Sequence, residues 1–508
     1  MSPLWAAKFH PVDDHEFAAM LSLHESSIAT RLFVRFVEMS PAEDFPNGAH
    51  WRPAVWLARA LESEVFGTHV HLYFFWRNLL LAILGLLAAG FALAIREVLQ
   101  QNSLSSFSGV VAATILSLIV VSTPVLFDVF GRLLPGEMYT LIGLLTWLMA
   151  WTRLVSCRRE SFTPSAKLLS LFWVGLVLMT TGKEDAAFLW PTAFLLSLPE
   201  ILFLRESRPL AIFLSVVSTG ALWLAAGFQT FRTVFLSSAG LPYHMQKDTG
   251  FRQIVDGLTR INNVQLAFAL CAIALIALWR RKVSGDIIRI MLFIASSLLL
   301  ELVYVSSVPV GVPRYSAAIL VLTSLMIFCA IAVHSATVRS STLNHRGVTA
   351  FFLAVLFPLM AIGAGHQRTN NILYRDISLN WNNALSDIHI LTQQSEFKQI
   401  LLVVDPPDAN SVGRWEKSYS FAKSMRLLTD SRVRNFMVVM DPRARGVLPS
   451  VDGALRETSL LGTKDAAGYI FYPISLLQDV ESLCVLYTDS GRTFPYLEKC
   501  GAVYRMTL

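Results

Sequence analysis

Acidic side chains gather near the beginning of the sequence, where residues 9–17 read FHPVDDHEF. This segment contains the adjacent pair Asp13-Asp14 and, two residues later, Glu16. A carboxylate can take a proton from an acceptor hydroxyl, and paired carboxylates can hold a divalent cation. An Asp-Asp pair in a loop also serves as a helix cap or a solvated turn. The pair is therefore a candidate catalytic or cation-binding site, with a structural role as the alternative.

Arginines and lysines accompany acids at later points of the chain, near the ends of apolar runs. Such cations can hold a phosphate or pyrophosphate through charge-assisted hydrogen bonds, and ionisable groups at membrane depth usually mark a site or a pathway. The alternative is that the acids complement helix dipoles and the cations snorkel. The candidates are Arg52 in Trp51-Arg52-Pro53, then Asp128, Arg132 and Glu137 in FDVFGRLLPGE, the pair Lys183-Glu184, and the pair Arg314-Tyr315.

Histidine and cysteine do not form a metal site in this sequence. His10, His15 and His24 lack the spacing of a ligand set, and the five cysteines include no CxxC pair. Cys484 and Cys500 are the only two cysteines after residue 366. They could form a disulfide if this part of the chain faces an oxidising compartment, or remain two separate thiols.

The candidate residues lie in a strongly apolar chain. Of its 508 residues, 54% are hydrophobic and 15% are charged, against roughly 25% charged residues in an ordinary soluble domain. The mean hydropathy is +0.52. This composition excludes a disordered chain, a coiled coil and most soluble enzymes. In a membrane protein the distribution of charge matters more than the net charge of +6, which gives no argument for a nucleic-acid partner.

Apolar runs predict ten membrane-spanning helices, since a hydrocarbon core of ~30 Å needs about 20 apolar residues per helix. In one run, Pro191 and Pro199 predict a kink or a break. We expect three parts: 1–72, a first extracytoplasmic segment with the acidic pair; 73–365, a transmembrane bundle; and 366–508, a soluble extracytoplasmic domain. The expected spans are 73–95, 107–127, 137–152, 168–182, 186–204, 209–228, 264–279, 286–308, 315–337 and 347–364.

Basic residues are distributed unevenly between the two sets of connections, and this predicts their sidedness. One set holds twelve Lys and Arg in 45 residues, at 96–106, 153–167, 205–208, 280–285 and 338–346. The other set holds seven in 53, at 128–136, 183–185, 229–263 and 309–314. The first set is therefore expected in the cytoplasm, and both terminal segments outside it. Because 1–72 contains no signal or span, we expect a further helix upstream of Met1, or else a span count that is off by one.

The last part of the chain reads as a small α/β domain. Residues 366–394 predict one or two surface helices and 418–428 another, while 399–405, 434–441, 468–474 and 483–489 predict strands. Asp405, Asp441 and Asp489 end these strands, where Asp commonly begins a turn, and no glycine-rich phosphate loop follows. We expect this domain to recognise an acceptor or to cover the membrane site.

Taken in order, the motifs resemble those of multi-spanning glycosyltransferases that use lipid-phosphate sugars, the GT-C fold. The closest resemblance is to the protein O-mannosyltransferase-like branch and its bacterial relatives, over about residues 10–330. That family places a span before the acidic pair, in agreement with the upstream helix expected above. The resemblance rests on Asp13-Asp14 with Glu16, Trp51-Arg52-Pro53, a short helix with a Phe66-Gly67 turn and a span entered with Asn78, Gly131-Arg132 with Glu137, Lys183-Glu184 with Pro191, and Arg314-Tyr315.

The resemblance implies transfer of a sugar from a polyprenyl-phosphate carrier to a lipid, glycan or protein acceptor, with inversion at the anomeric carbon. Asp13 or Asp14 would be the base that activates the acceptor, and Asp128 or Glu137 a second acid near it. The acidic pair could also hold a divalent cation, as its residue types allow, and no other cofactor is expected. The leaving phosphate would be neutralised by Arg132, Lys183 and Arg314, and Glu16, Arg52, Glu184 and Tyr315 would complete the substrate-binding set.

Two other functions compete with glycosyl transfer. A transporter or flippase of a lipid-linked or small polar solute would have charges at mid-membrane depth and internal repeats. A non-catalytic scaffold or sensor would have its active part in 366–508. Under the first hypothesis the chain is a polytopic α-helical membrane protein of the bacterial inner membrane, with about ten spans in a GT-C-like bundle. Its active site and C-terminal α/β domain would both be extracytoplasmic.

Overall fold

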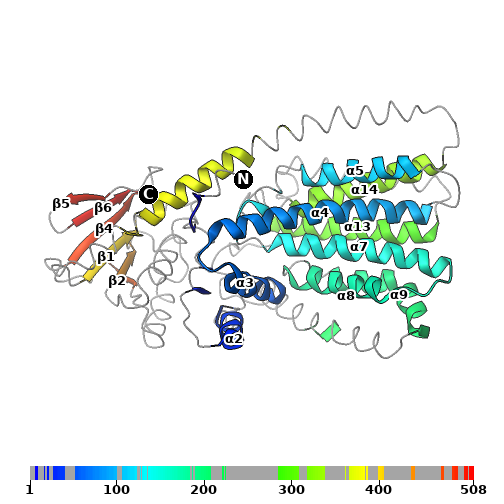
Figure 1. The fold of residues 1–508 in the computed structure, drawn as a ribbon, viewed down its shortest axis with the longest axis horizontal. Coiled ribbons are helices and arrows are strands. Elements are labelled where there is room, and N and C mark those ends of the chain that lie inside the picture. The colour runs from blue at the N-terminus through cyan, green and yellow to red at the C-terminus, as the bar shows by residue number, and fades with distance from the viewer. Residues whose placement is uncertain are drawn as a thin grey trace. The chain divides into compact units, whose positions relative to one another are not determined.

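A computed structural model gives the fold of the chain (Figure 1). It divides into two compact units, Met1–Met39 with Ala58–Phe75 and Arg368–Leu508, and Ser40–Leu57 with Trp76–Gln367. The structure describes residues 6–9, 17, 20–21, 27–39, 52–99, 106–122, 126, 129–133, 136–183, 186, 189–207, 220–221, 224, 284–307, 317–337, 361, 365, 367–383, 385–386, 399–404, 436–440, 471–473, 483–489, 497–500 and 503–507.

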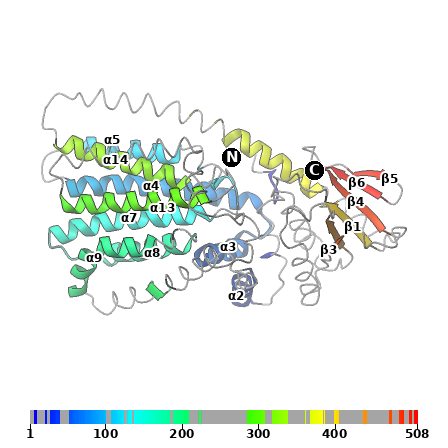
Figure 2. The same cartoon turned by 180° about the vertical axis from the view of Figure 1, so that it is seen from behind.

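Long apolar helices make up the second unit, and Figures 1 and 2 show them side by side in a bundle. Seven of the ten expected spans correspond to these helices, while 209–228, 264–279 and 347–364 lie almost wholly outside the described residues. The seven are α4 (Val70–Leu99, which begins in the first unit), α5 (Ser106–Val121), α7 (Glu137–Arg159), α8 (Ala166–Thr181), α9 (Leu189–Ser207), α13 (Gly285–Ser307) and α14 (Ala317–Thr337).

Two of the described helices, α4 and α7, are long and apolar enough to cross a membrane. The apolar stretches Ala166–Thr181, Leu189–Leu204 and Ala317–Ala330 are shorter. Helix α9 continues through Pro199, so the proline does not break it. Pro191 lies in the first turn of α9, where a backbone N–H has no helical partner to lose.

The entry into the bundle follows the order expected from the sequence. Helix α3 (Pro53–Phe66) begins with proline, whose fixed φ suits the first helical position. It ends at Phe66, and Gly67 takes a positive φ of 53°, a backbone conformation that favours glycine. The Gly67 carbonyl accepts a hydrogen bond of 3.0 Å from the hydroxyl of Tyr73 in α4. The predicted helix, Phe-Gly turn and following helix are thus confirmed.

Helices α7 and α8 pack closely because two glycines face the partner helix. A Cβ atom on Gly143 of α7 would lie 2.3 Å from the backbone nitrogen of Met179, and one on Gly175 of α8 would lie 2.5 Å from that of Trp147. Small residues at a helix crossing let two backbones approach each other. Beside this crossing, the Trp147 ring lies 4.6 Å from that of Phe293 in α13, centroid to centroid.

A buried carboxylate joins α9 to α7 and α13. Glu200 has no exposure to solvent, and its oxygens accept hydrogen bonds from Trp151 Nε1 (2.9 Å) and Arg158 Nε (2.8 Å). Arg289 of α13 donates to both oxygens, at 2.8 and 2.9 Å. Asp286, one turn before Arg289, accepts from Arg158 Nη2 at 2.7 Å. We call these groups, together with Arg159, the Glu200 network.

Arg159 extends the Glu200 network to a fourth helix. Its Nε donates to Asp286 at 2.6 Å, and its Nη1 donates to the carbonyl of Val98 in α4 at 2.8 Å. Since Val98 and Arg159 are both near the C-terminal ends of their helices, α4 and α7 run in the same direction. Asp286 is near the start of α13, so α13 runs the opposite way.

In the first unit, a helix over 367–383 packs on the N-terminal segment. Ser378 Oγ accepts from the backbone N–H of Lys8, and Asn382 Nδ2 donates to the carbonyl of Phe9. Trp381 in the same helix is 2% exposed. This helix, expected at the surface, therefore buries one face. Helix α2 (Ile28–Met39) is held to the end of α3 by an ion pair between Arg31 and Glu64.

The C-terminal part contains a six-stranded sheet in the order β3-β2-β1-β4-β6-β5. All neighbours are parallel except β5 and β6. The helix expected at 418–428 lies outside the described residues, so the α/β character of this part stays a prediction. The strands are β1 (Gln399–Val404), β2 (Phe436–Met440), β3 (Phe471–Pro473), β4 (Leu483–Asp489), β5 (Leu497–Cys500) and β6 (Val503–Thr507).

The strand order excludes the disulfide considered between Cys484 and Cys500. Cys484 is in β4 and Cys500 is in β5, and β6 lies between these strands. Two interstrand spacings separate their Cα atoms by about 9–10 Å. A disulfide requires a Cα separation of about 4.4–6.8 Å. Of the two alternatives that the sequence left open, the backbone spacing therefore favours two separate thiols.

We predict that Gly143→Ala destabilises the bundle, because the new methyl group would meet the backbone of α8. Overpacking of this kind costs about 1–3 kcal/mol. The measurement is the thermal unfolding midpoint of purified protein in detergent. Gly285→Ala is the matched control, since a Cβ there meets nothing within 4 Å, and its midpoint should be unchanged or higher. Equal midpoints for the two variants would contradict the close crossing.

We also predict that Glu200→Gln destabilises the bundle by about 2–3 kcal/mol. This is below the roughly 3–5 kcal/mol of a fully buried pair, because Arg158 and Arg289 are partly exposed. Asp376→Asn should cost less than about 1 kcal/mol, because the Arg375–Asp376 pair is on the surface. Unfolding midpoints in detergent again measure both. A Glu200→Gln protein as stable as Asp376→Asn would show that the network does not hold the helices.

Candidate functional site

A buried arginine of α4 anchors the chain just before α7. Arg77 has no exposure to solvent. Its Nη2 donates a 2.7 Å hydrogen bond to the carbonyl of Leu133, and its Nη1 donates a 3.4 Å bond to the hydroxyl of Tyr139. Arg132, the neighbour of Leu133, is exposed. The Arg77 contact therefore fixes the backbone that presents Arg132, one of the phosphate-binding residues expected from the sequence.

Three of the sequence motifs meet at the same end of the bundle. A Cβ atom on Gly136 would lie 3.0 Å from the carbonyl oxygen of Gly182 and 3.7 Å from Nη1 of Arg52. Gly136 directly precedes Glu137, and Gly182 directly precedes Lys183. Segments separated by dozens of residues in the sequence are thus in close contact. We call the side chains of Arg52, Arg77, Arg132, Glu137 and Lys183 the Lys183 cluster.

Two charged groups of the Lys183 cluster are buried, and each is at a helix end of opposite partial charge. Glu137 is 6% exposed and opens α7, whose N-terminus favours an anion. Lys183 is 2% exposed and follows Gly182, the C-terminal cap of α8, where a cation is favoured. Part of the role of both residues is therefore structural. Burial also means that a charged ligand reaching them would interact in a medium of low dielectric constant.

The Lys183 cluster has four cations and one carboxylate. Two of the cations are guanidinium groups that are at least partly buried, Arg52 and Arg77. Guanidinium and ammonium groups bind phosphate oxygens through charge-assisted hydrogen bonds, and a guanidinium can do so with two parallel bonds. These residue types bind anions with several oxygens, such as a phosphate. Glu137 provides one acid beside it.

The remaining site residues expected from the sequence lie outside the described residues, and so does any cation site formed by the acidic pair. The expectation that they join the same cavity stays a prediction. These residues are Asp13, Asp14, Glu16, Asp128, Glu184, Arg314 and Tyr315.

Sequence reasoning missed Arg77 and the acids of the Glu200 network. A signal was present in both cases. Arg77 interrupts an apolar run that is otherwise long enough to span a bilayer, and Glu200 lies within another apolar run next to Pro199. Burying an ionisable residue inside such a run costs free energy unless the residue has a partner. Its presence therefore indicates a buried contact or a functional site. The partners themselves come from other helices.

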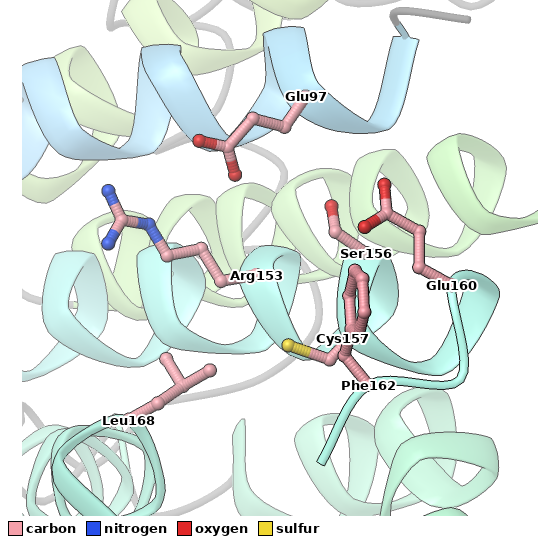
Figure 3. Close-up of a pocket in the computed structure, with 7 residues that line it drawn as sticks. All are labelled: Glu97, Arg153, Ser156, Cys157, Glu160, Phe162 and Leu168. Atoms are coloured by element: carbon pink, nitrogen blue, oxygen red, sulfur yellow. The ribbon is translucent and has the colours of Figure 1, made fainter. Parts of the chain in front are cut away.

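At the opposite end of the bundle there is a pocket of about 450 Å³ (Figure 3). Its lining includes Glu97 near the end of α4 and Arg153 and Glu160 at the end of α7. None of these residues was expected to form a site. The pocket and the Lys183 cluster are at opposite ends of α7, because one adjoins Arg159 and the other adjoins Glu137.

No protein family, curated protein or solved structure matches this chain. The function is therefore inferred from the residues and their geometry.

We predict that Arg77→Leu loosens the segment that presents Arg132. The carbonyl of Leu133 would lose its buried donor, and an unsatisfied buried polar group costs about 1–3 kcal/mol. Trypsin should then cleave after Arg132 faster than in the unchanged protein. Tyr139→Phe is the matched control, since it removes the longer 3.4 Å bond and keeps the Arg77 bond to Leu133, so it should alter the cleavage rate little. Equal cleavage rates for Arg77→Leu and the unchanged protein would count against the anchoring role.

Proposed function

We propose that this protein is a multi-pass membrane glycosyltransferase that moves a sugar from a polyprenyl-phosphate carrier to an acceptor at the extracytoplasmic face. The observation that carries this proposal is the meeting of Arg52, Glu137 and Lys183 at one end of the helix bundle. These residues belong to three motifs of the GT-C resemblance. The acceptor is a lipid, a glycan or a protein.

Membrane placement is supported by α4 and α7, the two helices with the length and composition of a span. The helix directions also agree with the uneven distribution of Lys and Arg between the two sets of connections, since α13 runs opposite to α4 and α7. Arg158, Arg159 and Asp286 lie together at one end of the bundle, and that end adjoins the strongly basic connections expected in the cytoplasm. The Lys183 cluster is at the other end, where a lipid-linked donor facing outward would be available.

In the proposed reaction, the acceptor hydroxyl gives its proton to a carboxylate while its oxygen attacks the anomeric carbon. The bond from that carbon to the phosphate oxygen breaks, and polyprenyl phosphate leaves with an additional negative charge. Arg132 and Lys183, joined by Arg314, would stabilise this charge, which is greatest in the transition state and after it. Asp13 or Asp14 would be the base, and Glu137 the second acid near the acceptor.

A transporter of a lipid-linked or small polar solute is the second candidate, and one observation favours it. Glu301 is 2% exposed in α13 and lies six residues, about 9 Å, before the end of that helix. A buried acid at this depth is typical of an ion or substrate pathway. In proteoliposomes, a transporter would move the lipid-linked sugar between leaflets without forming a glycosylated product, so product formation separates the two functions.

We predict that Asp13→Asn or Asp14→Asn lowers the rate of sugar transfer by about 10²–10⁴-fold, because an amide cannot accept the acceptor's proton. Lys183→Met should instead weaken binding of the polyprenyl-phosphate sugar and raise its KM. The measurement is transfer by purified full-length protein from a polyprenyl-phosphate donor.

Lys167→Met is the control, because Lys167 is exposed at the start of α8, at the opposite end from Lys183. Its transfer rate and KM should match those of the unchanged protein. Unchanged transfer by both aspartate variants would remove the acidic pair from the mechanism. An unchanged KM in Lys183→Met would remove the Lys183 cluster from donor binding.

A further inference from the structure

The pocket at the cytoplasmic end of the bundle combines charges of both signs with apolar groups (Figure 3). Arg153, Ser156, Cys157 and Glu160 are spaced at i, i+3, i+4 and i+7, which places them on one face of α7 and of the residue that caps it. In Figure 3 the carboxylate of Glu97, from α4, faces the same space as the guanidinium of Arg153. The pocket therefore has one cation and two carboxylates around a common space.

Two polar atoms of residues that line this pocket have no partner among the described residues. Nε of Arg153 and Oγ of Ser156 are buried and have no hydrogen-bond partner among the described residues. In the Glu200 network, by contrast, the arginines bond to carboxylates or carbonyls. Buried donors normally find a partner, either in the protein or in a bound molecule. Both residues line the pocket, and the terminal guanidinium nitrogens of Arg153 can donate to the oxygens of a phosphate.

The charges are ordered by depth along α7. Arg153 lies six residues, about 9 Å, from the end of the helix, whereas Glu160 is beyond that end. Leu168, in the first turn of α8, also lines the pocket, and Phe162 in the connecting turn is 63% exposed. From the bundle outward, the order is thus a cation and then a carboxylate with an aromatic ring near it.

This order matches one class of membrane lipid. In an ethanolamine phospholipid, the phosphate is deeper in the membrane and the ammonium is farther out. Arg153 would hold the phosphate, while Glu97 and Glu160 would accept hydrogen bonds from the ammonium. Phe162 offers a ring face near the ammonium, and Leu168 would lie against the start of an acyl chain. Two carboxylates against one guanidinium disfavour a purely anionic head group.

We propose that this pocket binds the phosphoethanolamine head group of a phospholipid in the cytoplasmic leaflet. The proposal rests on the membrane placement given under the proposed function, but not on glycosyl transfer. A pocket of about 450 Å³ is within the range of roughly 300–1,000 Å³ of small-molecule sites.

The test is native mass spectrometry of the full-length protein in detergent, titrated with phospholipids of identical acyl chains. Phosphatidylethanolamine should bind about tenfold more tightly than phosphatidylcholine, whose quaternary ammonium has no N–H to donate, and more tightly still than anionic phosphatidylglycerol. Equal binding of the three lipids, or a preference for phosphatidylglycerol, would overturn the proposal.

Single variants assign the effect to the pocket. Glu97→Gln and Glu160→Gln should each reduce the preference for ethanolamine over choline, and Arg153→Met should weaken binding of both lipids by about tenfold. Lys167→Met is the control, because it removes an exposed nearby cation that does not line the pocket, and it should leave binding unchanged. Unfolding midpoints equal to that of the parent show that a loss of binding is local. If none of the three pocket variants altered binding, the lipid would bind elsewhere and the proposal would fail.

A competition experiment distinguishes a lipid from a soluble ligand that carries the same head group. If free phosphoethanolamine displaced the phospholipid at the concentration at which the phospholipid itself binds, the source would be soluble and the lipid assignment wrong. No displacement is the expected result, since the free head group lacks the acyl contact at Leu168. Lipid binding is read without sugar transfer, so failure of either proposal leaves the other open to its own test.

Discussion

The carboxylate of Glu200, which has no exposure to solvent, constrains how three helices of the bundle can pack. An isolated charge in such a place is prohibitively costly, so the chain must bring Arg158 and Arg289 to it from two other helices. Each of those arginines also bonds to Asp286. The groups form a closed set in which moving one helix along its axis would leave a buried charge without a partner. Helices α7, α9 and α13 are therefore fixed in register at this end.

That register is transmitted along α7 to its other end. Glu137 and Arg158 are separated by 21 residues, or about 32 Å of helix, close to the hydrocarbon thickness of a bilayer. Between them, the glycines at 143 and 175 hold α8 against α7 at backbone contact. The position of α8 in turn places Gly182 and Lys183 beside Gly136. The charged cluster at one end thus depends on contacts that begin at the other.

The two ends differ in how their charges are satisfied. In the Glu200 network, arginines and carboxylates from different helices bond to one another and hold the helices in place. In the Lys183 cluster, Arg77 donates hydrogen bonds to a carbonyl and a hydroxyl, and Glu137 and Lys183 lie buried at helix ends whose partial charge is opposite to their own. The locking contacts are therefore at the Glu200 end, and the donor site that we propose is at the Lys183 end.

Local patterns in the sequence predicted the apolar helices and most of the described strands. Runs of about 20 apolar residues can bury themselves only as helices, and Ser165 before α8 and Pro53 at the start of α3 mark helix beginnings by local hydrogen bonding and fixed φ. The alternating and β-branched runs at β1, β2 and β4 are equally local signals.

The long-range contacts could not be predicted in this way. They include the contact of Arg77 with Leu133, the contacts of Glu200 with Arg158 and Arg289, and the position of β6 between the two cysteine-bearing strands. A helix that is apolar all round has no polar face to show which side meets which neighbour, and a strand does not encode its partner. Those contacts are decided by the packing of segments far apart in the chain, where each buried charge must find its counterion.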